Sequence, residues 1–265
     1  ATLPIVSTLF SQTFLLDRGV FVVDTVGNDT RGPVSFLRGI VFVRPTAASV
    51  RLVAAELSHP RYSRYSLNFS NIVSSEMLNS LAASDVHATV TDVAECFADG
   101  VVINSDLMIV PPTSGIPRFS GSVTAVEDIA RLAQGVAATC LTLKRCPRVR
   151  VQNSSPLARK LCSDVVGIMG SDSELFALNH RETLLLVLDR CDDPITPLLS
   201  PWTYQAMLHE YVGIANNTVR LPGQKAEDSF VFSQSQDTFF TNNMTSNWGD
   251  LCVNLKAFVD EYKNV

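Results

Sequence analysis

The stretch GIVFVRPTAASVRLVAAELS at residues 39–58 decides the predicted fold. Its first half is rich in Val, Ile and Phe and ends in proline, which is typical of a β-strand. Thr46 can cap the helix that follows, and the apolar residues Val50, Val53 and Leu57 fall on one face of that helix. A strand followed directly by an amphipathic helix indicates the start of a βαβ unit.

The same alternation extends to both sides of this stretch. GVFVVDTV at 19–26 and YSLNFSN at 65–71 are predicted strands, a helix is predicted from Ser74, and VVINSDLMIV at 101–110 is predicted to be another extended segment. Strands that alternate with helices favour a mostly parallel sheet covered by helices on both faces. The first part of the chain is therefore predicted to be an α/β domain.

The composition changes at PPTSGIPRFSGS, residues 111–122, which combines prolines and glycines as a linker does. Beyond it, Thr124 and Glu127 have the spacing of a capping box at a helix start, and Ser155 followed by proline predicts a second helix. TLLLVLDR at 183–190 is a continuous apolar run, which is expected of a strand buried on both faces.

Two further helices are predicted near the end of the chain. One starts at Ser200 and ends at Gly213, and the other starts near residue 246.

Charge argues against one large class of functions. The net charge of -5 and the pI of 5.4 argue against a strongly basic nucleic-acid binder, and no apolar stretch approaches the roughly 20 residues that cross a bilayer. Residues 31–64 nevertheless hold six arginines and one acid, Glu56, whereas acidic residues outnumber basic ones from residue 170 onward. This asymmetry favours a binding partner with uneven charge, although solvated surface charges would give the same pattern.

An enzyme site is the alternative that the residues leave open. Asp189, Asp192 and Asp193 follow a predicted strand and could hold Mg²⁺ for phosphoryl transfer, so a magnesium-dependent α/β phosphohydrolase using Asp189 and Asp192 is the competing hypothesis. The structural interpretation is that Asp189 and Arg190 fix the corner after the strand. The sequence has no phosphate-binding P-loop, dinucleotide fingerprint or nucleophile elbow.

Histidine and cysteine give no further site. The four histidines and six cysteines lack the spacing of zinc ligands, so six reduced thiols and no metal or cofactor are expected.

The stretch LLLVLDRCDDPITPLLSPWTYQAMLHEYVGIANNTVRL at 184–221 closely resembles the signature of the SM proteins, the syntaxin-binding family named after Sec-one and Munc-eighteen. Residues 40–85, 132–155 and 237–259 resemble that family as well. The resemblance implies an incomplete arch. An α/β domain at 1–115 comes first, then a second α/β domain with an incomplete sheet at 116–220, and the helical start of a third at 221–265.

The resemblance also implies a function. SM proteins hold a syntaxin-type SNARE, assist its assembly into the SNARE complex during vesicle fusion, and are not enzymes. By that likeness the chain is expected to be cytoplasmic and peripheral at Golgi, endosomal or vacuolar membranes, and it would reach the membrane only through the SNARE. No nucleic acid is expected as a partner.

Two contact regions follow from the resemblance. A pocket for the N-terminal peptide of the syntaxin, where one buried Leu or Phe would contribute roughly 1.5–3 kcal/mol, matches the residues Met77, Leu78, Leu81, Phe97, Ile103 and Leu107. A cleft for the SNARE helices matches Arg38 and Arg44. The planar guanidinium of arginine suits acidic helices because it can bind a carboxylate through two hydrogen bonds.

Overall fold

The structure is a computed structural model, and it describes residues 2–28, 32–111, 123–172, 174–177, 183–215, 218–221, 223, 230–232, 234 and 237–263. The chain forms two compact units, one made of Ala1–Val101 and Ile109–Asp189, the other of Val102–Met108 and Arg190–Val265.

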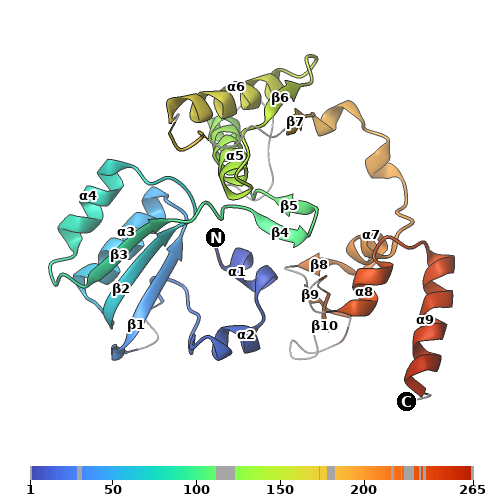
Figure 1. Cartoon of the computed structure of the whole chain (residues 1–265), viewed down its shortest axis with the longest axis horizontal. Coiled ribbons are helices and arrows are strands. Elements are labelled where there is room, and N and C mark those ends of the chain that lie inside the picture. Colours follow the sequence, from blue (N-terminus) through green and yellow to red (C-terminus); the bar gives the residue numbers. More distant parts are fainter. Residues whose placement is uncertain are drawn as a thin grey trace. The chain divides into compact units, whose positions relative to one another are not determined.

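A three-stranded parallel sheet organises the first unit, in the order β1 (Val34–Val43), β2 (Tyr62–Phe69) and β3 (Val90–Glu95) (Figure 1). Helices α3 (Ala47–Ser58) and α4 (Ser75–Ser84) connect these strands. The predicted alternation of strands and helices is thus confirmed. The prediction that these helices cover both faces is wrong, because α3 and α4 pack against the same side of the sheet. The caps are local, as expected: the Thr46 and Ser74 side chains each accept a backbone hydrogen bond from the first turn of the helix that follows.

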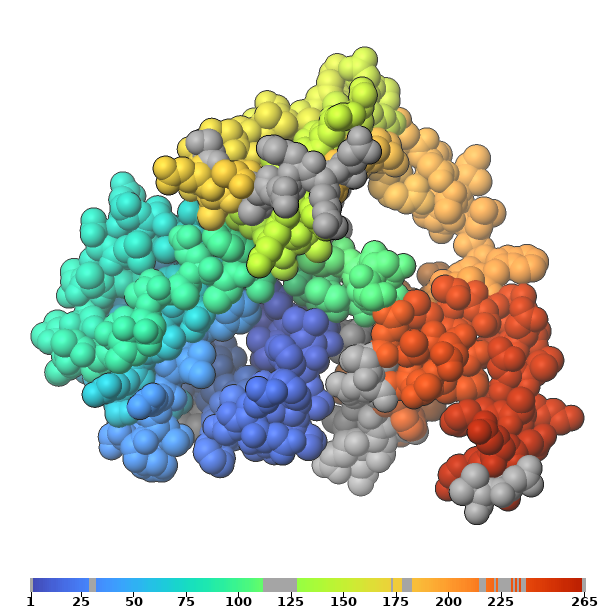
Figure 2. Space-filling model, viewed as in Figure 1, coloured from blue at the N-terminus to red at the C-terminus, as the bar shows by residue number. Residues whose placement is uncertain are grey.

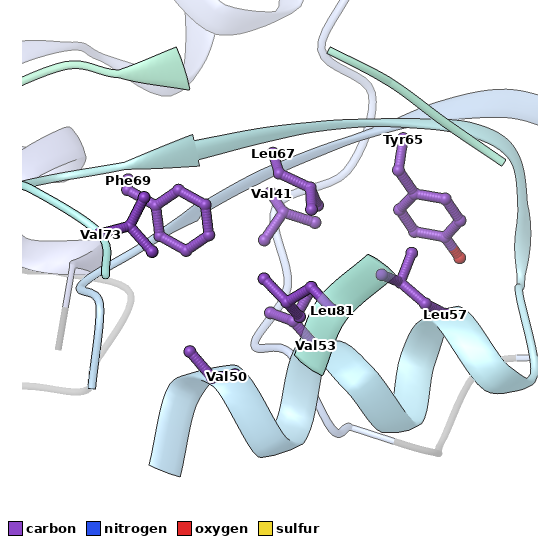
Figure 3. Packing of buried hydrophobic residues seen from close by; sticks show 9 residues of the cluster. All are labelled: Val41, Val50, Val53, Leu57, Tyr65, Leu67, Phe69, Val73 and Leu81. Atoms are coloured by element: carbon purple, nitrogen blue, oxygen red, sulfur yellow. The ribbon is translucent and has the colours of Figure 1, made fainter. Parts of the chain in front are cut away.

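The core of this unit lies between the sheet and the two helices (Figure 3). Val53 and Leu57 of α3 point at the sheet and are fully buried. The cluster of buried hydrophobic residues consists of Val41, Val50, Val53, Leu57, Tyr65, Leu67, Phe69, Val73 and Leu81. Alternate residues of β2 enter it because successive side chains of a strand point to opposite faces.

Tyr65 carries a polar group into this core, and Glu56 satisfies it. The Tyr65 hydroxyl donates to Glu56 Oε1 at 2.5 Å, and Glu56 also pairs with Arg61 Nη2 at 2.6 Å. Burial together with the Glu56 hydrogen bond raises the pKa of Tyr65 to about 12. Burial alone would raise the pKa of Glu56, but hydrogen bonds from Arg61 and Tyr65 outweigh it and hold that pKa below its ordinary value.

Acid should therefore weaken this unit. The Glu56 carboxylate stabilises the fold fully above its unfolded pKa, about 4.3, and that contribution is lost as pH falls through the lower folded pKa. Glu56→Gln is expected to be less stable than the wild type at pH 7, and the difference should shrink toward pH 3. Urea unfolding at several pH values, followed by circular dichroism, measures this. A difference independent of pH would contradict it.

The predicted strand at 19–26 is wrong. The N-terminal segment instead contains two short helices, α1 (Leu3–Leu9) and α2 (Gln12–Asp17), and residues 20–25 have no regular structure. Phe21 is 71% exposed. The apolar run has strand propensity, but a strand needs a paired neighbour, and no strand among the described residues pairs with this run.

Two helices and two strands form the rest of the first unit: α5 (Val123–Thr142), β6 (Arg148–Val151), α6 (Pro156–Ser171) and β7 (Leu184–Val187). β6 and β7 pair in parallel, and the Ser155 side chain caps α6 as predicted. The helix predicted beyond the linker is present as α5, but the side chains of its first turn, and so the capping box, lie outside the described residues.

The prediction that the run at 183–190 is buried on both faces is wrong for β7. Leu184 and Leu186 are 60% and 55% exposed, and the alternate residues Leu185 and Val187 are only partly buried. Among the described residues this sheet has two strands, so β7 has a neighbour on one side only. The apolar run has the composition of a central strand, but in the described residues it lacks the second neighbouring strand that a central strand has.

The predicted extended segment at 101–110 is instead a hairpin. Its strands are β4 (Val101–Asn104) and β5 (Leu107–Ile109), joined by a turn at Ser105 and Asp106. In the second unit the Asn104 and Gln205 side chains exchange two hydrogen bonds, at 2.9 and 3.2 Å. The turn is thereby tied to the helical part of that unit.

The remaining elements of the second unit are short, except for the last helix. They are η1 (Arg190–Asp192), η2 (Thr196–Leu198), α7 (Tyr204–Met207), η3 (Leu208–Val212), β8 (Ile214–Ala215), β9 (Thr218–Val219), β10 (Phe230–Val231), α8 (Thr238–Asn243) and α9 (Trp248–Lys263).

The helix predicted from Ser200 starts later, at Tyr204, and ends at Gly213 with φ +90°, as the glycine predicted. The predicted last helix is confirmed as α9. Its side chains beyond Leu251 are exposed, and the space-filling view shows this helix in red at the surface (Figure 2).

These units do not follow the predicted ranges 1–115, 116–220 and 221–265. The sheet of β1 to β3 belongs to one unit with α5 and α6. Most of the predicted linker, residues 112–122, lies outside the described residues. The division into three domains stays a prediction.

Candidate partner-binding surface

The predicted peptide pocket begins on α4, and there the side chains divide between core and surface. Leu81 is 3% exposed and belongs to the core cluster, and Met77 packs against that cluster. Leu78 is exposed. Of the three, therefore, Leu78 offers most surface to a partner, because the domain's own core takes up the apolar side of an amphipathic helix.

Phe97 lies in a different cluster. It has a positive φ of 53° and packs against the group formed by Ala137, Cys140, Leu141 and Phe176. The expectation that Phe97 lines one pocket with Met77 and Leu81 is not met, since the two clusters are separate. Ile103 and Leu107 lie on β4 and β5, in the second unit.

Arg44 also departs from the prediction. It was expected at a surface cleft, but it is 9% exposed, and its Nε donates to Asp99 Oδ1 at 2.9 Å. Arg131 of α5 binds the same carboxylate, with Nη1 2.7 Å from Oδ2. The Ser70 hydroxyl and the Asn71 amide also donate to Asp99, at 3.1 and 2.8 Å.

This buried cluster of Arg44, Ser70, Asn71, Asp99 and Arg131 links the sheet to α5. Asp99 is 2% exposed, so its negative charge depends on these partners in place of water. Burial lowers the pKa of Arg131 to about 10, with Asp99 opposing the shift and Arg44 adding to it. Arg131 therefore stays charged at neutral pH and serves the fold.

Arg38, the other predicted cleft residue, is exposed on β1. Along this strand Phe36, Arg38 and Ile40 are exposed, whereas Gly39 and Val41 are buried. Phe36 and Ile40 reach 84% and 72% exposure. We call the side of the β1–β2 sheet away from α3 its open face.

Sequence reasoning missed one member of the open face, Arg64 of β2. The parallel register places Arg64 directly beside Arg38, and both are exposed. Strand alternation alone predicts that the side chain of Arg64 points to the face of the sheet opposite to the buried Tyr65 and Leu67. The sequence therefore indicated the direction of the Arg64 side chain, but it did not give the strand register that places Arg64 beside Arg38.

Two of the proposed magnesium ligands, Asp189 and Asp193, have other roles. Asp189 Oδ2 accepts a hydrogen bond from the Ser155 hydroxyl at 2.5 Å, and the Asp189 backbone N–H donates to Gln152 Oε1 at 2.8 Å. Asp189 thus holds the residue that caps α6, while Arg190 pairs with Asp193 at 3.4 Å.

No group of three or more metal-ligating side chains occurs in the part of the chain that the structure describes. All six cysteines are free thiols. None of the described helices combines the length and apolar character needed to cross a membrane.

Comparison with known proteins identifies the family. The model of the Sec1 family matches residues 1–265. The chain belongs to the Sec1 family. The match covers both compact units.

Individual Sec1-family relatives agree. The chain is 36% identical over 268 residues to vacuolar protein sorting-associated protein 45 of Mus musculus, which covers 99% of this chain and 46% of that protein. A solved structure of the SM protein Vps45 gives a TM-score of 0.93, and one of Vps45 in complex with the Qa SNARE Tlg2 gives 0.94. Both are 40% identical and cover 99% of this chain. The chain spans about half the length of these relatives.

Proposed function

We propose that this Sec1-family chain is part of an SM-type regulator of SNARE-mediated vesicle fusion. It binds a syntaxin-type SNARE and the assembled SNARE complex in protein transport between Golgi, endosome and vacuole. The observation that supports this most is the likeness to Vps45 solved with a Qa SNARE, at a TM-score of 0.94 over 99% of the chain. We also propose that it acts in the cytoplasm, at the membrane that carries the SNARE, and the same likeness supports this.

The mechanism is binding, with no bond made or broken. A surface that binds SNARE helices in an ordered arrangement lowers the entropic cost of their later assembly with their partners. The open face fits this task, since exposed Phe36 and Ile40 flank an exposed Arg38. No observation on Asp189 or Asp192 favours the phosphohydrolase.

Two contact regions belong to the proposal. The SNARE helices meet the open face through Arg38, while Arg44 is buried and pairs with Asp99. The N-terminal peptide of the SNARE is bound in the first unit, on α4, which carries Met77, Leu78 and Leu81. On α4 its contact is Leu78, the most exposed of the three helix residues.

Calorimetry with the 265-residue chain tests this proposal. The cytosolic region of a Qa SNARE of the Tlg2 type is expected to bind with saturable heat, and Leu78→Arg should weaken binding of its N-terminal peptide at least tenfold, since the contact would bury a charge. Leu52→Arg is the matched control, because Leu52 is an exposed leucine of α3. No heat from the intact cytosolic region would contradict the proposal.

A further inference from the structure

The buried cluster around Asp99 lies at the carboxyl edge of the parallel sheet. Arg44 follows directly after β1, and Ser70 and Asn71 follow directly after β2. Asp99 lies in the loop after β3. In open α/β sheets, ligands are ordinarily bound outside the carboxyl ends of the strands. This group of residues, the Asp99 cluster, therefore occupies the place of a ligand site in a fold of this kind.

Donors from four side chains converge on both oxygens of one carboxylate. Asp99 Oδ1 accepts hydrogen bonds from Arg44 Nε at 2.9 Å, Arg131 Nη2 at 3.0 Å and the Ser70 hydroxyl at 3.1 Å. Asp99 Oδ2 accepts one from the Asn71 amide at 2.8 Å and lies 2.7 Å from Arg131 Nη1. Guanidinium, amide and hydroxyl donors around two oxygens are the groups with which proteins bind a free carboxylate.

The donors of the Asp99 cluster exceed what Asp99 itself uses. Two guanidinium groups face one carboxylate, and both arginines are buried. The buried nitrogens Arg44 Nη2 and Arg131 Nε have no hydrogen-bond partner among the described residues. A buried cation is costly unless an anion lies beside it. The donor groups therefore require an anion at this place, whichever molecule supplies it.

Two of the donors are held by contacts that do not involve the Asp99 side chain. The Asn71 amide also donates to the main-chain carbonyl of Gln134 in α5, at 3.1 Å. Arg131 Nη2 also donates to the main-chain carbonyl of Asp99, at 3.2 Å. These bonds remain when the Asp99 side chain is shortened. The substitution would then leave a small cavity lined by cationic and polar donors.

We propose that the Asp99 cluster is a carboxylate-binding site that the chain fills with its own side chain, and that a small free carboxylate binds there once that side chain is shortened. Asp99→Ala removes one carboxyl group, so formate matches the space. Asp99→Gly removes the methylene carbon as well, so acetate matches it. The wild type should bind neither, because a tethered carboxylate has a high effective concentration. The inference does not depend on the proposed function.

Urea unfolding of the whole 265-residue chain, followed by circular dichroism, tests this. Sodium formate is expected to shift the midpoint of Asp99→Ala to higher urea than sodium chloride of the same ionic strength, and the shift should grow with the logarithm of the formate concentration. The chloride arm accounts for screening by salt. Acetate should bind Asp99→Ala about tenfold more weakly than formate, because its methyl group does not fit, whereas Asp99→Gly should reverse this preference.

Three variants control for general effects of the salts. Asp92→Ala removes an exposed carboxylate of the same sheet, and Asp99→Asn keeps the volume of the side chain, so neither should distinguish formate from chloride. Asp99→Ala combined with Arg131→Leu should lose the response to formate. An equal midpoint of Asp99→Ala in formate and chloride would overturn the inference. So would a formate shift of the same size in the wild type, in Asp92→Ala or in the double variant.

Folding itself is the readout if Asp99→Ala is unfolded in chloride. Formate is then expected to restore the circular dichroism spectrum of the wild type, because a ligand that binds only the native state favours folding. A chain that stays unfolded in both salts would overturn the inference.

Discussion

Replacing Asp99 with alanine is expected to lower the free energy of unfolding of the first unit by about 3–5 kcal/mol, because removal of one partner leaves buried charges uncompensated. Arg44 and Arg131 would both lose their carboxylate while almost out of contact with water. A loss of this size is a large fraction of the 5–15 kcal/mol by which domains are typically stable. Chemical unfolding followed by circular dichroism measures it.

Asp92→Ala is the matched control for Asp99→Ala. Asp92 is an exposed aspartate on β3, the edge strand of the same sheet, and it makes no ion pair in the described parts of the chain. A substitution of that kind usually changes stability by less than about 0.5 kcal/mol. If both variants unfold at the same denaturant concentration, the cluster does not stabilise the fold as argued.

Leu57→Ala is expected to cost about 2–5 kcal/mol, because it leaves a cavity between α3 and the sheet. Leu57 is fully buried in the cluster that includes Val53 and Tyr65. Leu52→Ala on the same helix is the comparison, since Leu52 is 47% exposed and its loss should cost less than about 1 kcal/mol. A thermal melt of both variants distinguishes them, and equal melting temperatures would contradict the assigned core.

Features that depend on a few neighbouring residues could be predicted from the sequence. The helix starts at Thr46, Ser74 and Ser155 were predictable because a capping side chain bonds to its own helix. The inward positions of α3 were predictable for a similar reason, since 3.6-residue periodicity alone identifies one face of a helix.

Features that depend on distant partners could not be predicted. Strand alternation predicts that the side chains of Arg38 and Arg44 point to the same side of β1. Arg44 is nevertheless buried, because it pairs with Asp99, and a partner 55 residues further along the chain cannot be read from the strand itself. The run at 19–26 has strand composition, but none of the strands that the structure describes pairs with it. For the candidate surface, the likeness to a family supplied Arg38, whereas its pairing with Arg64 required the register of the sheet.

The ion cluster around Asp99 also limits where the polypeptide can be divided. A shorter piece ending at residue 111 would keep all three strands of the sheet but lose α5 and with it Arg131. Asp99 would keep its ion pair with Arg44 but lose the one with Arg131. The surface of this piece that α5 covers would become exposed to solvent. Expression of that half by itself should yield a poorly cooperative protein, so limited proteolysis of the whole polypeptide is a better route to its minimal stable core.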